Sequence, residues 1–474
     1  MKRKETLLYN FIIKNIINKY DFTELIKVFL SPEDFKTFTE AEYNDLSDDE
    51  KRAAENVFFN EDISDDKNHI KRQLYRFLSE LTGVTPPWGI LTGVRPVKLA
   101  GELLQKYGSA EKVLKELKEN YYLDDEKANL IIDTHLYQQE ICGSPDHSSV
   151  GIYIGIPFCP TRCLYCSFTS NQASDSEIER YLKALKNEIA FVGKRMRETD
   201  LWAESIYIGG GTPTTLSAEQ LDDLLQSVED NIDLSRNIEF TVEAGRPDTI
   251  TDEKLKVIKR HGVDRISINP QSMKGRTLEL IGRSHKPEDI TEAFIKAQRA
   301  GIPIVNADII AGLPEEDSDD FAGTLEKILN LGPENITVHT LAVKRASKLV
   351  ELDKDYHYKH ADLVKEMLEI SRKVLAESGY RPYYLYRQKH MAGALENIGY
   401  TKDNTPCIYN IRIMEERQTV LALGAGGISK MYYPDENRLE RVPNVSNYEI
   451  YISRLDEMLE RKEKNIFMEV KRGC

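Results

Sequence analysis

Residues 150–166 read VGIYIGIPFCPTRCLYC, an apolar run followed by three closely spaced cysteines. The run Val150–Ile156 is short, apolar and rich in β-branched residues, which predicts a buried strand. Cys159, Cys163 and Cys166 follow it in the spacing CxxxCxxC. Three thiolates on one short loop can each bind one iron of a 4Fe–4S cluster and leave the fourth iron open to another ligand. This stretch therefore predicts a strand that ends at an iron–sulfur site.

Short β-rich runs and helical patterns alternate from this first strand to residue 377. The runs that predict strands are Val150–Ile156, Ser205–Ile208, Ile238–Glu243, Arg265–Ile268, Ile302–Ile310 and Asn335–Leu341. The patterns that predict helices are Glu177–Arg197, Ala218–Val228, Asp252–His261, Pro287–Ala300, Ser318–Leu331 and Ala361–Glu377. Six strand–helix units in this order predict an α/β fold with a parallel sheet, either curled or open.

Glycine-rich or polar residues stand at the ends of the next four strands. The stretch Gly209–Thr214 (GGGTPT) follows the second strand, and Glu243 ends the third. Gln271 and Arg283 follow the fourth strand, and Asp308 lies near the end of the fifth. In a barrel of parallel strands the carboxyl ends share one mouth, where the chemistry collects. Glycines at such a place let the backbone approach a ligand closely.

The composition of the chain excludes several classes of protein. The 474 residues carry 64 basic and 78 acidic side chains, and this formal charge of −14 excludes a global basic field for nucleic acid. Hydrophobic residues make up 41% of the chain, which is enough to bury a core. No apolar run reaches the roughly 18 residues of a membrane span. The basic start precedes an interrupted apolar stretch, which favours an amphipathic helix over a signal peptide and hence a cytoplasmic protein.

The three remaining cysteines, Cys142, Cys407 and Cys474, are scattered along the chain. A disulfide framework would need more pairs in a much smaller chain. A structural zinc site usually adds a second Cys or Cys/His pair, and the sequence shows none. We therefore interpret these three residues as lone thiols that behave as small apolar side chains.

The first 147 residues lack the strand–helix rhythm of the rest. Apolar spacing over residues 7–17 predicts a helix, and a second helix is predicted at Lys67–Leu81. The acidic stretches Glu40–Glu50 and Glu61–Asp66 are interpreted as solvated loops. The chain is thus expected to divide into three parts. They are a mainly helical accessory domain at 1–147, a core at 148–380 and a small C-terminal α+β extension at 381–474.

The cysteine loop and the Gly209–Thr214 strand end resemble those of the radical S-adenosylmethionine superfamily. Within it, the chain is similar to the branch of oxygen-independent coproporphyrinogen III oxidase, also called coproporphyrinogen dehydrogenase. Further phrases that carry the resemblance are Ser267–Ser272, Ile281–Arg283 and Asp308–Pro314. The resemblance covers roughly residues 150–430. It implies a partial (β/α)6 parallel barrel of radical S-adenosylmethionine type.

The resemblance also implies roles for individual residues. Cys159, Cys163 and Cys166 would bind the 4Fe–4S cluster, and the methionine part of S-adenosylmethionine would chelate the open iron. Members of this branch hold a second S-adenosylmethionine. The positions that match cofactor-binding residues are Tyr153, Tyr165, Gly210, Gly211, Thr212, Glu243, Gln271, Arg283 and Asp308. Gly210, Gly211 and Thr212 would lie along the methionine part. Asp308 would bind a ribose hydroxyl and Tyr165 would lie near the adenine, while the other four are divided between the two molecules.

The reaction implied by the resemblance converts coproporphyrinogen III to protoporphyrinogen IX. Reductive cleavage of S-adenosylmethionine would give a 5′-deoxyadenosyl radical, which would take a hydrogen atom from the β-carbon of a substrate propionate. Loss of carbon dioxide and one electron would leave a vinyl group, and two rounds would complete the product. The implied partners are a tetrapyrrole substrate and an electron donor such as flavodoxin or ferredoxin, with no nucleic acid and no membrane.

A substrate with four carboxylates requires local cations in a chain of this charge. Lys344, Arg345 and Lys348, just past the sixth strand, are candidates, with Arg283 nearer the mouth. The alternative for the first three is a solvated basic helix start. His339 either faces the cavity or is a satisfied core histidine, and the second interpretation is favoured.

Two positions depart from the pattern of the branch. Gly155 stands where the branch usually has His, and Phe168 stands where the best-characterised oxidases have a fourth Cys. Phe168 is shared with related haem chaperones, but the His of their His-Asn-x-x-Tyr-Trp phrase is absent from Glu396–Tyr400. Two alternatives stay open. One is a radical enzyme that methylates or degrades another tetrapyrrole such as haem, and the other is a haem chaperone.

Overall fold

The computed structural model describes residues 8–61, 64–166, 170–342, 349, 360–388 and 395–471. The chain divides into two compact units. The N-terminal unit comprises Met1–His135, Arg387–Lys389 and Gly393–Leu395, and the C-terminal unit comprises Leu136–Tyr386, His390–Ala392 and Glu396–Cys474. The predicted separation of a C-terminal extension at residue 381 stays a prediction.

The N-terminal unit contains a three-stranded parallel sheet among the described residues. The central strand β1 (Tyr9–Ile13) lies between β2 (Phe35–Thr39) and β3 (Glu55–Phe59). The helix predicted over residues 7–17 is therefore wrong. A central parallel strand is buried on both faces and need not alternate apolar with polar residues, so a short run of this kind cannot be distinguished from a helix by its periodicity. Burial of every β1 residue after Tyr9 agrees with this account.

Helices complete the N-terminal unit, as expected for a mainly helical region. They are α1 (Tyr20–Ile26), α2 (Glu40–Asn44), α3 (Asp48–Arg52), α4 (Lys67–Thr82), α5 (Pro96–Tyr107), α6 (Ala110–Glu119) and the first part of α7 (Asp125–Cys142). Helix α4 confirms the second predicted helix. Helices α2 and α3 replace the loop predicted for Glu40–Glu50. They form because Thr39 and Ser47 make capping boxes with the glutamates three residues later.

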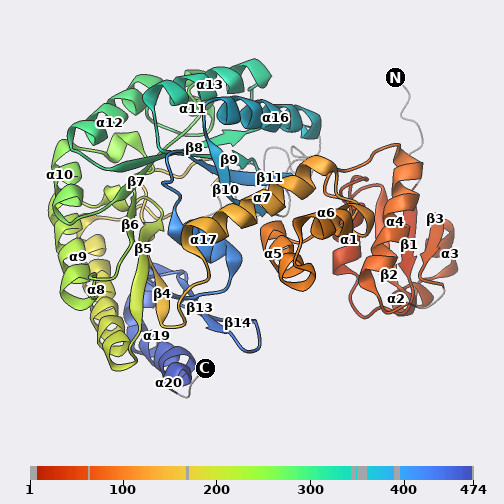
Figure 1. Ribbon diagram of the computed structural model, residues 1–474, viewed down its shortest axis with the longest axis horizontal. Coiled ribbons are helices and arrows are strands. Elements are labelled where there is room, and N and C mark those ends of the chain that lie inside the picture. The colour runs from red at the N-terminus through yellow and green to blue at the C-terminus, as the bar shows by residue number, and fades with distance from the viewer. Residues whose placement is uncertain are drawn as a thin grey trace. The chain divides into compact units, whose positions relative to one another are not determined.

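The C-terminal unit is built on one eleven-stranded sheet, counted over the described residues (Figure 1). Its order is β10-β11-β9-β8-β7-β6-β5-β4-β12-β13-β14. Six consecutive strands pair in parallel: β4 (Ser149–Ile156), β5 (Trp202–Gly210), β6 (Glu239–Glu243), β7 (Arg265–Gln271), β8 (Ile304–Ala311) and β9 (Asn335–Thr340). All six predicted strands are confirmed, and the sheet is a partial barrel that stays open.

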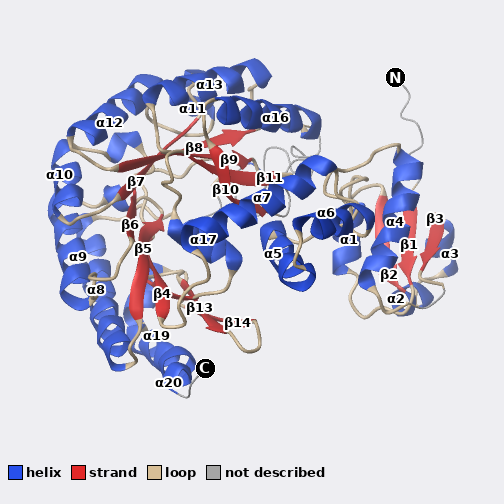
Figure 2. Cartoon of the chain, viewed as in Figure 1, coloured by secondary structure: helices blue, strands red, loops and turns tan. Residues whose placement is uncertain are grey.

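The crossover helices cover the outer side of the curved sheet, as Figure 2 shows. They are α8 (Asp175–Glu198), α9 (Ala218–Asn231), α10 (Asp252–Arg260), α11 (Gly275–Leu280), α12 (Pro287–Arg299), α13 (Ser318–Leu331) and α16 (Ala361–Glu377), with 3-10 turns η1 (Pro213–Thr215) and η2 (Pro247–Thr249). The six predicted helices are confirmed. Each turns an apolar stripe to the strands, as α8 does with Ile178, Leu182 and Leu185. The inner face and the carboxyl ends of the strands are therefore left for other groups.

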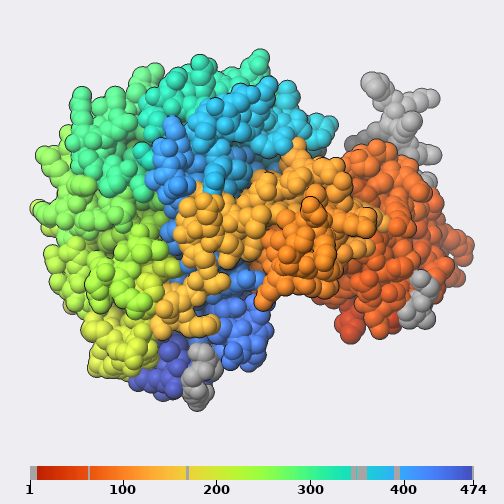
Figure 3. Space-filling model, viewed as in Figure 1, coloured from red at the N-terminus to blue at the C-terminus, as the bar shows by residue number. Residues whose placement is uncertain are grey.

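Residues 381–471 extend the same sheet at both edges. Strands β10 (Arg381–Arg387) and β11 (Glu396–Thr401) lie beyond β9, and β12 (Thr419–Leu423), β13 (Ile428–Tyr433) and β14 (Arg438–Pro443) lie beyond β4. Strand β12 pairs with β4 in parallel. The helical segments are α17 (Ile408–Glu415), α18 (Tyr448–Ser453), α19 (Leu455–Lys462), η4 (Glu463–Phe467) and α20 (Met468–Lys471). In Figure 3 the blue C-terminal residues pack beside the yellow-green α8. None of the helices in the described ranges has the length and hydropathy to cross a membrane.

A buried ion pair joins the C-terminal helices to the first crossover helix. Lys462 on α19 lies 2.8 Å from Glu188 on α8, and both side chains are fully buried. Glu188 also accepts hydrogen bonds from Tyr451 Oη at 2.6 Å, from the Gly424 N–H at 2.7 Å and from Asn444 Nδ2 at 3.0 Å. A buried carboxylate with this many donors is stable only while they stay in place.

We expect Lys462→Met to lower the free energy of unfolding by about 3–5 kcal/mol, because it leaves the Glu188 charge buried and uncompensated. Denaturant unfolding of the C-terminal unit, followed by near-UV circular dichroism, measures the change. Lys194→Met is the matched control, since it removes an exposed partner of Glu198 on the same helix and costs about 0.5 kcal/mol or less. Equal losses in the two variants would contradict this account.

Candidate functional site

The cysteine loop begins where β4 ends, at the carboxyl edge of the parallel sheet. Asn171 closes the loop: its N–H donates to Pro157 O at 2.9 Å, and its carbonyl accepts the Cys159 N–H at 3.0 Å. Cys163 is buried, whereas Cys159 and Cys166 are partly exposed. The three predicted thiols therefore lie on one closed loop, and Phe168 lies outside the described residues.

The glycine-rich turn Gly209–Thr214 packs directly against this loop. The Gly211 N–H donates to Ile156 O at 2.8 Å. A Cβ at Gly211 would lie 2.5 Å from Phe158 O and 2.9 Å from Cys159 Sγ, closer than real side chains approach. Glycine is thus required for contact between two segments of the chain itself, which the sequence did not predict. The predicted contact of this turn with a cofactor stays a prediction.

The three thiols share one electrostatic environment. Burial raises the pKa of Cys159 to about 11; the Thr212 hydroxyl, 3.5 Å from the sulfur, lowers it, and the neighbouring Cys166 and Cys163 add to the rise. Within the described ranges, no three Cys, His, Asp or Glu side chains converge as ligands of a single metal ion. A 4Fe–4S cluster offers each thiolate a separate iron, so its ligands need not converge on one point. The donor set fits a cluster better than a single ion.

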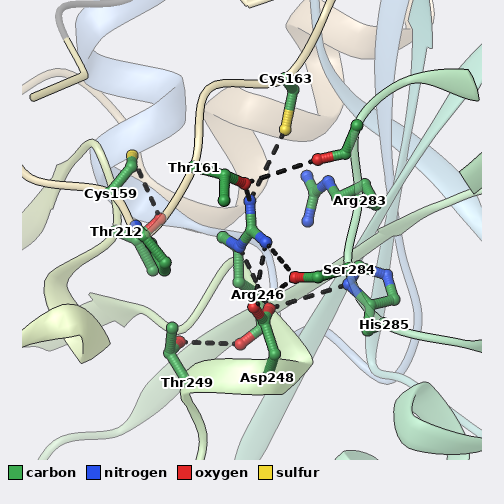
Figure 4. Close-up of polar contacts among 12 residues, drawn as sticks. Cys159, Thr161, Cys163, Thr212, Arg246, Asp248, Thr249, Arg283, Ser284 and His285 are labelled. Carbon is green, nitrogen blue, oxygen red and sulfur yellow. Dashed lines mark hydrogen bonds and ion pairs between the residues drawn. The ribbon is translucent and has the colours of Figure 1, made fainter. Parts of the chain in front are cut away.

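Arg246 connects the cysteine loop to the ends of β6 and β7 (Figure 4). Its side chain is 4% exposed. Nη1 donates to Thr161 Oγ1 at 2.8 Å and lies 3.9 Å from Cys163 Sγ. Nε and Nη2 donate to the two carboxylate oxygens of Asp248 at 3.1 and 2.9 Å, and Nη2 also donates to Ser284 Oγ at 2.9 Å. One guanidinium thus joins three loops.

Arg283 makes a second connection to the cysteine loop. Nη2 donates to Tyr165 Oη at 2.9 Å, and Nη1 donates to Gly245 O at 3.0 Å. The neighbouring Leu164 N–H donates to Ile281 O at 3.0 Å. Burial raises the pKa of Tyr165 above its usual range although the Arg283 charge lowers it. Two residues predicted for separate roles therefore form one hydrogen-bonded pair.

Three tyrosines stack on the inner face of the sheet. The ring centroids of Tyr207 and Tyr409 are 4.8 Å apart, and Tyr153 lies 6.3 Å from each. Tyr207 Oη donates to Glu243 Oε1 at 2.6 Å. A Cβ at Gly209 would lie 2.8 Å from Tyr207 Cε1 and 3.0 Å from Glu243 Cδ, so glycine makes room for this pair. Burial raises the pKa of all three phenols, which keeps them protonated.

Acidic and imidazole groups lie farther along the same face. Burial raises the pKa of Glu243 to about 7; the Tyr207 hydrogen bond lowers it, and the charge of Asp308 raises it further. Asp308 Oδ2 lies 3.6 Å from His339 Nε2, and Tyr386 Oη lies 3.4 Å from His339 Nδ1. The side chain of His339 is 27% exposed, so the interpretation of a core histidine is wrong: it pairs with a polar group of the site.

A second pair of stacked tyrosines, Tyr384 and Tyr386 on β10, depends on one glycine of β11. Tyr384 Oη lies 3.3 Å from Thr337 Oγ1, across β11 from its own strand. A Cβ at Gly399 would be 1.8 Å from Tyr384 Cε1, so the ring crosses β11 only because Gly399 lacks a side chain. Tyr386 stacks beside Tyr384, with ring centroids 6.2 Å apart. Aromatic rings therefore gather at two places, beside β4 and β5 and on β10.

Gln271 carries an unsatisfied acceptor. It ends β7 after a break in register, with φ of 66°, and is 7% exposed. Its Oε1 atom has no hydrogen-bond partner in the described part of the chain. A buried acceptor in this state costs about 1–3 kcal/mol. A ligand with a hydrogen-bond donor would remove that cost.

The parallel sheet places all twelve predicted site residues on neighbouring strands or the loops that follow them. The sequence analysis missed Arg246, Asp248, Tyr207 and Tyr409. Arg246 and Asp248 stand only three and five residues past Glu243, so the end of the third strand was a signal that could have been followed further. Tyr409 carried no such signal, because it comes from α17 and reaches the site through tertiary packing alone.

The chain is similar to known proteins in sequence and in structure. Residues 153–328 match the family model of the radical SAM superfamily. Over 405 residues the chain is 40% identical to the oxygen-independent coproporphyrinogen-III oxidase-like protein HemZ of Bacillus subtilis, which spans 84% of this chain and 80% of that protein. The heme chaperone HemW of Bacillus subtilis is 33% identical over 234 residues, 49% of this chain and 61% of that protein. The structure of coproporphyrinogen III oxidase (HemN) from Escherichia coli, a radical SAM enzyme, matches with a TM-score of 0.51 and 21% identity, over 68% of this chain and 72% of that chain.

We expect Gly211→Ala to weaken iron binding. Overpacking against the cysteine loop costs about 1–3 kcal/mol, which corresponds to roughly fivefold or more in the affinity of the loop for a cluster. Iron and sulfide per chain after anaerobic reconstitution measure the loss. Gly323→Ala, where an added Cβ meets nothing within 4 Å, should load fully. Full loading of the Gly211 variant would show that the loop does not need this contact.

Proposed function

We propose a function from one premise: the chain belongs to the radical S-adenosylmethionine superfamily, in the group of oxygen-independent coproporphyrinogen III oxidase-like proteins. The function is oxidative decarboxylation of two propionates of coproporphyrinogen III to vinyl groups, which yields protoporphyrinogen IX. The observation that carries the proposal is the 40% identity to HemZ over most of both chains. The meeting of the cysteine loop, Glu243, Gln271 and Asp308 at one mouth supports it.

Cys159, Cys163 and Cys166 would hold a 4Fe–4S cluster. When bound, the cluster supplies one electron for reductive cleavage of S-adenosylmethionine and so gives the radical that removes hydrogen from the substrate. The chain contributes the loop that fixes the thiols, and the Gly211 and Arg246 contacts hold that loop against the strand ends. A fixed loop keeps the cofactor in register with the substrate.

S-adenosylmethionine would lie along the strand ends next to the cysteine loop. The free Gln271 Oε1 can accept a hydrogen bond from it, and the Asp308 carboxylate, 21% exposed, can accept one from a ribose hydroxyl. Gly210, Gly211 and Thr212 would lie along the methionine part, and Tyr165 near the adenine. Tyr153, Glu243 and Arg283 complete a set that would serve two such molecules.

The tetrapyrrole would lie against the inner face beside Tyr153, Tyr207 and Tyr409, because its individual pyrrole rings pack well on aromatic side chains. Arg283 and Arg246 are buried and already paired, so they are poorly placed for four substrate carboxylates. The cations predicted for this task, Lys344, Arg345 and Lys348, lie outside the described residues. A low-potential protein such as flavodoxin or ferredoxin would supply the electron.

A haem chaperone is the second candidate, because HemW relatives match half of the chain. The position of the haem-binding phrase of those chaperones falls on β11, where Glu396 and Asn397 are each 1% exposed. Asn397 Oδ1 accepts the Thr340 N–H at 2.8 Å and so serves the sheet. A buried strand without the His offers haem no axial ligand, which favours the enzyme.

The reconstituted protein, incubated anaerobically with S-adenosylmethionine, dithionite and coproporphyrinogen III, should release two carboxyl groups per substrate. Mass spectrometry follows the products, and 5′-deoxyadenosine should accumulate in parallel. Cys163→Ala should abolish both, because it removes a ligand of the cluster, while Cys142→Ala should keep both. If 5′-deoxyadenosine forms and the porphyrinogen stays intact, the substrate is another tetrapyrrole. Stoichiometric haem binding without turnover would instead indicate the chaperone.

We expect Gln271→Leu to weaken binding of S-adenosylmethionine while leaving the fold intact. The loss is about 1 kcal/mol or more, at least about fivefold in Kd, because a ligand donor loses its acceptor. Isothermal titration under anaerobic conditions measures it. Gln226→Leu, on the exposed surface of α9, is the matched control. Equal affinity in both variants would show that Gln271 does not touch the ligand.

A further inference from the structure

Arg246 holds a guanidinium directly against a thiol of the cysteine loop. Nη1 lies 3.9 Å from Cys163 Sγ, and Cys163 itself is 8% exposed. Because both side chains are buried, water does not replace this contact. At such a distance and degree of burial, a full positive charge acts on the sulfur with little screening.

The position of Arg246 is fixed from all sides. Its carbonyl accepts a hydrogen bond from Thr249 Oγ1 at 2.8 Å, and Thr249 Oγ1 lies 2.7 Å from Thr214 Oγ1 in the glycine-rich turn. Its side chain is held by Thr161, Asp248 and Ser284, as Figure 4 shows. The charge therefore cannot move away when the charge of its neighbours changes.

In the ion pair with Asp248, the positive member lies nearer to Cys163 than the negative member does. The Asp248 carboxylate binds Nε and Nη2, whereas Nη1 faces Thr161 and Cys163. The positive group thus stands between the sulfur and the carboxylate. Because the guanidinium is nearer, the pair presents its positive end to the cysteine loop, and Asp248 reduces that field without cancelling it.

We propose that Arg246 is a positioning residue that holds Cys163 in place and raises the reduction potential of the cluster bound there. Reduction adds one electron from the external donor and hence one negative charge to the site. A fixed positive group favours the state with the extra negative charge, and an N–H directed at a thiolate sulfur does the same. This inference rests on the cluster of the proposed function and does not depend on which tetrapyrrole is the substrate.

The inference predicts opposite shifts for the two members of the ion pair. Arg246→Gln removes the positive group and leaves the Asp248 charge, so the potential should become more negative than in the unaltered protein. Asp248→Asn keeps a hydrogen-bond acceptor for Arg246 and removes the opposing charge, so the potential should become more positive. A purely structural contribution would loosen the loop in both variants and could not give shifts of opposite sign.

The experiment is an anaerobic redox titration of the reconstituted protein, without tetrapyrrole, monitored by electron paramagnetic resonance of the reduced cluster. Arg412→Gln is the matched control, because it removes an equally buried guanidinium, paired with Glu204 at the opposite end of β5, and should leave the potential unchanged. Iron per chain is measured for every variant. If Arg246→Gln does not retain iron, the Asp248→Asn measurement decides the question.

Shifts of the same sign in the two variants, or no shift in Asp248→Asn, would overturn the inference. An Arg412→Gln shift as large as that of Arg246→Gln would overturn it as well. A wild-type chain that binds no iron would overturn both the cluster and this inference. The two variants could show the predicted opposite shifts in a protein that does not act on coproporphyrinogen III. The inference would then stand, and the proposed substrate would be wrong.

Discussion

The contact between the ends of β4 and β5 is the constraint on which the site depends. The two strands pair in parallel register up to Ile156 and Gly210, and the next residue, Gly211, meets the cysteine loop with no space for a Cβ. This contact determines where Cys159 lies relative to the sheet. Because the six strands β4–β9 run in the same direction, their carboxyl ends all lie at the edge of the sheet that carries this loop.

Helix α17 completes the inside of the partial barrel from the opposite end. Glu239, at the start of β6, accepts hydrogen bonds from the backbone N–H groups of Ile408 at 2.8 Å and Tyr409 at 3.2 Å, and so caps the helix. The same carboxylate lies 3.3 Å from Arg265, which is 1% exposed. This anchoring places Tyr409 against Tyr207. Helix α17, distant in the sequence, thereby places Tyr409 next to the candidate site.

Among the described residues, the two arginines beside the cysteine loop are buried and paired. Arg246 is bound to Asp248, while contacts with His285 and Arg246 hold the pKa of Asp248 well below its usual range despite partial burial. Arg283 is bound to Tyr165. The net charge of −14 is a property of the whole chain and does not describe this local field. The inner face also carries Tyr153, Tyr207 and Tyr409, which burial keeps neutral.

The sequence by itself determined the six strands, the six crossover helices and the placement of the candidate site residues at the strand ends. Their apolar periodicities are local properties, and the carboxyl ends of parallel strands meet by topology alone. The sequence misread β1 as a helix, because burial on both faces removes the alternation that marks a strand. Only the tertiary structure decided that Gly211 serves the cysteine loop, that Arg246 contacts Cys163 and that Tyr409 enters the tyrosine stack. Each of these depends on distances between segments that lie dozens to hundreds of residues apart, and no local pattern encodes such distances.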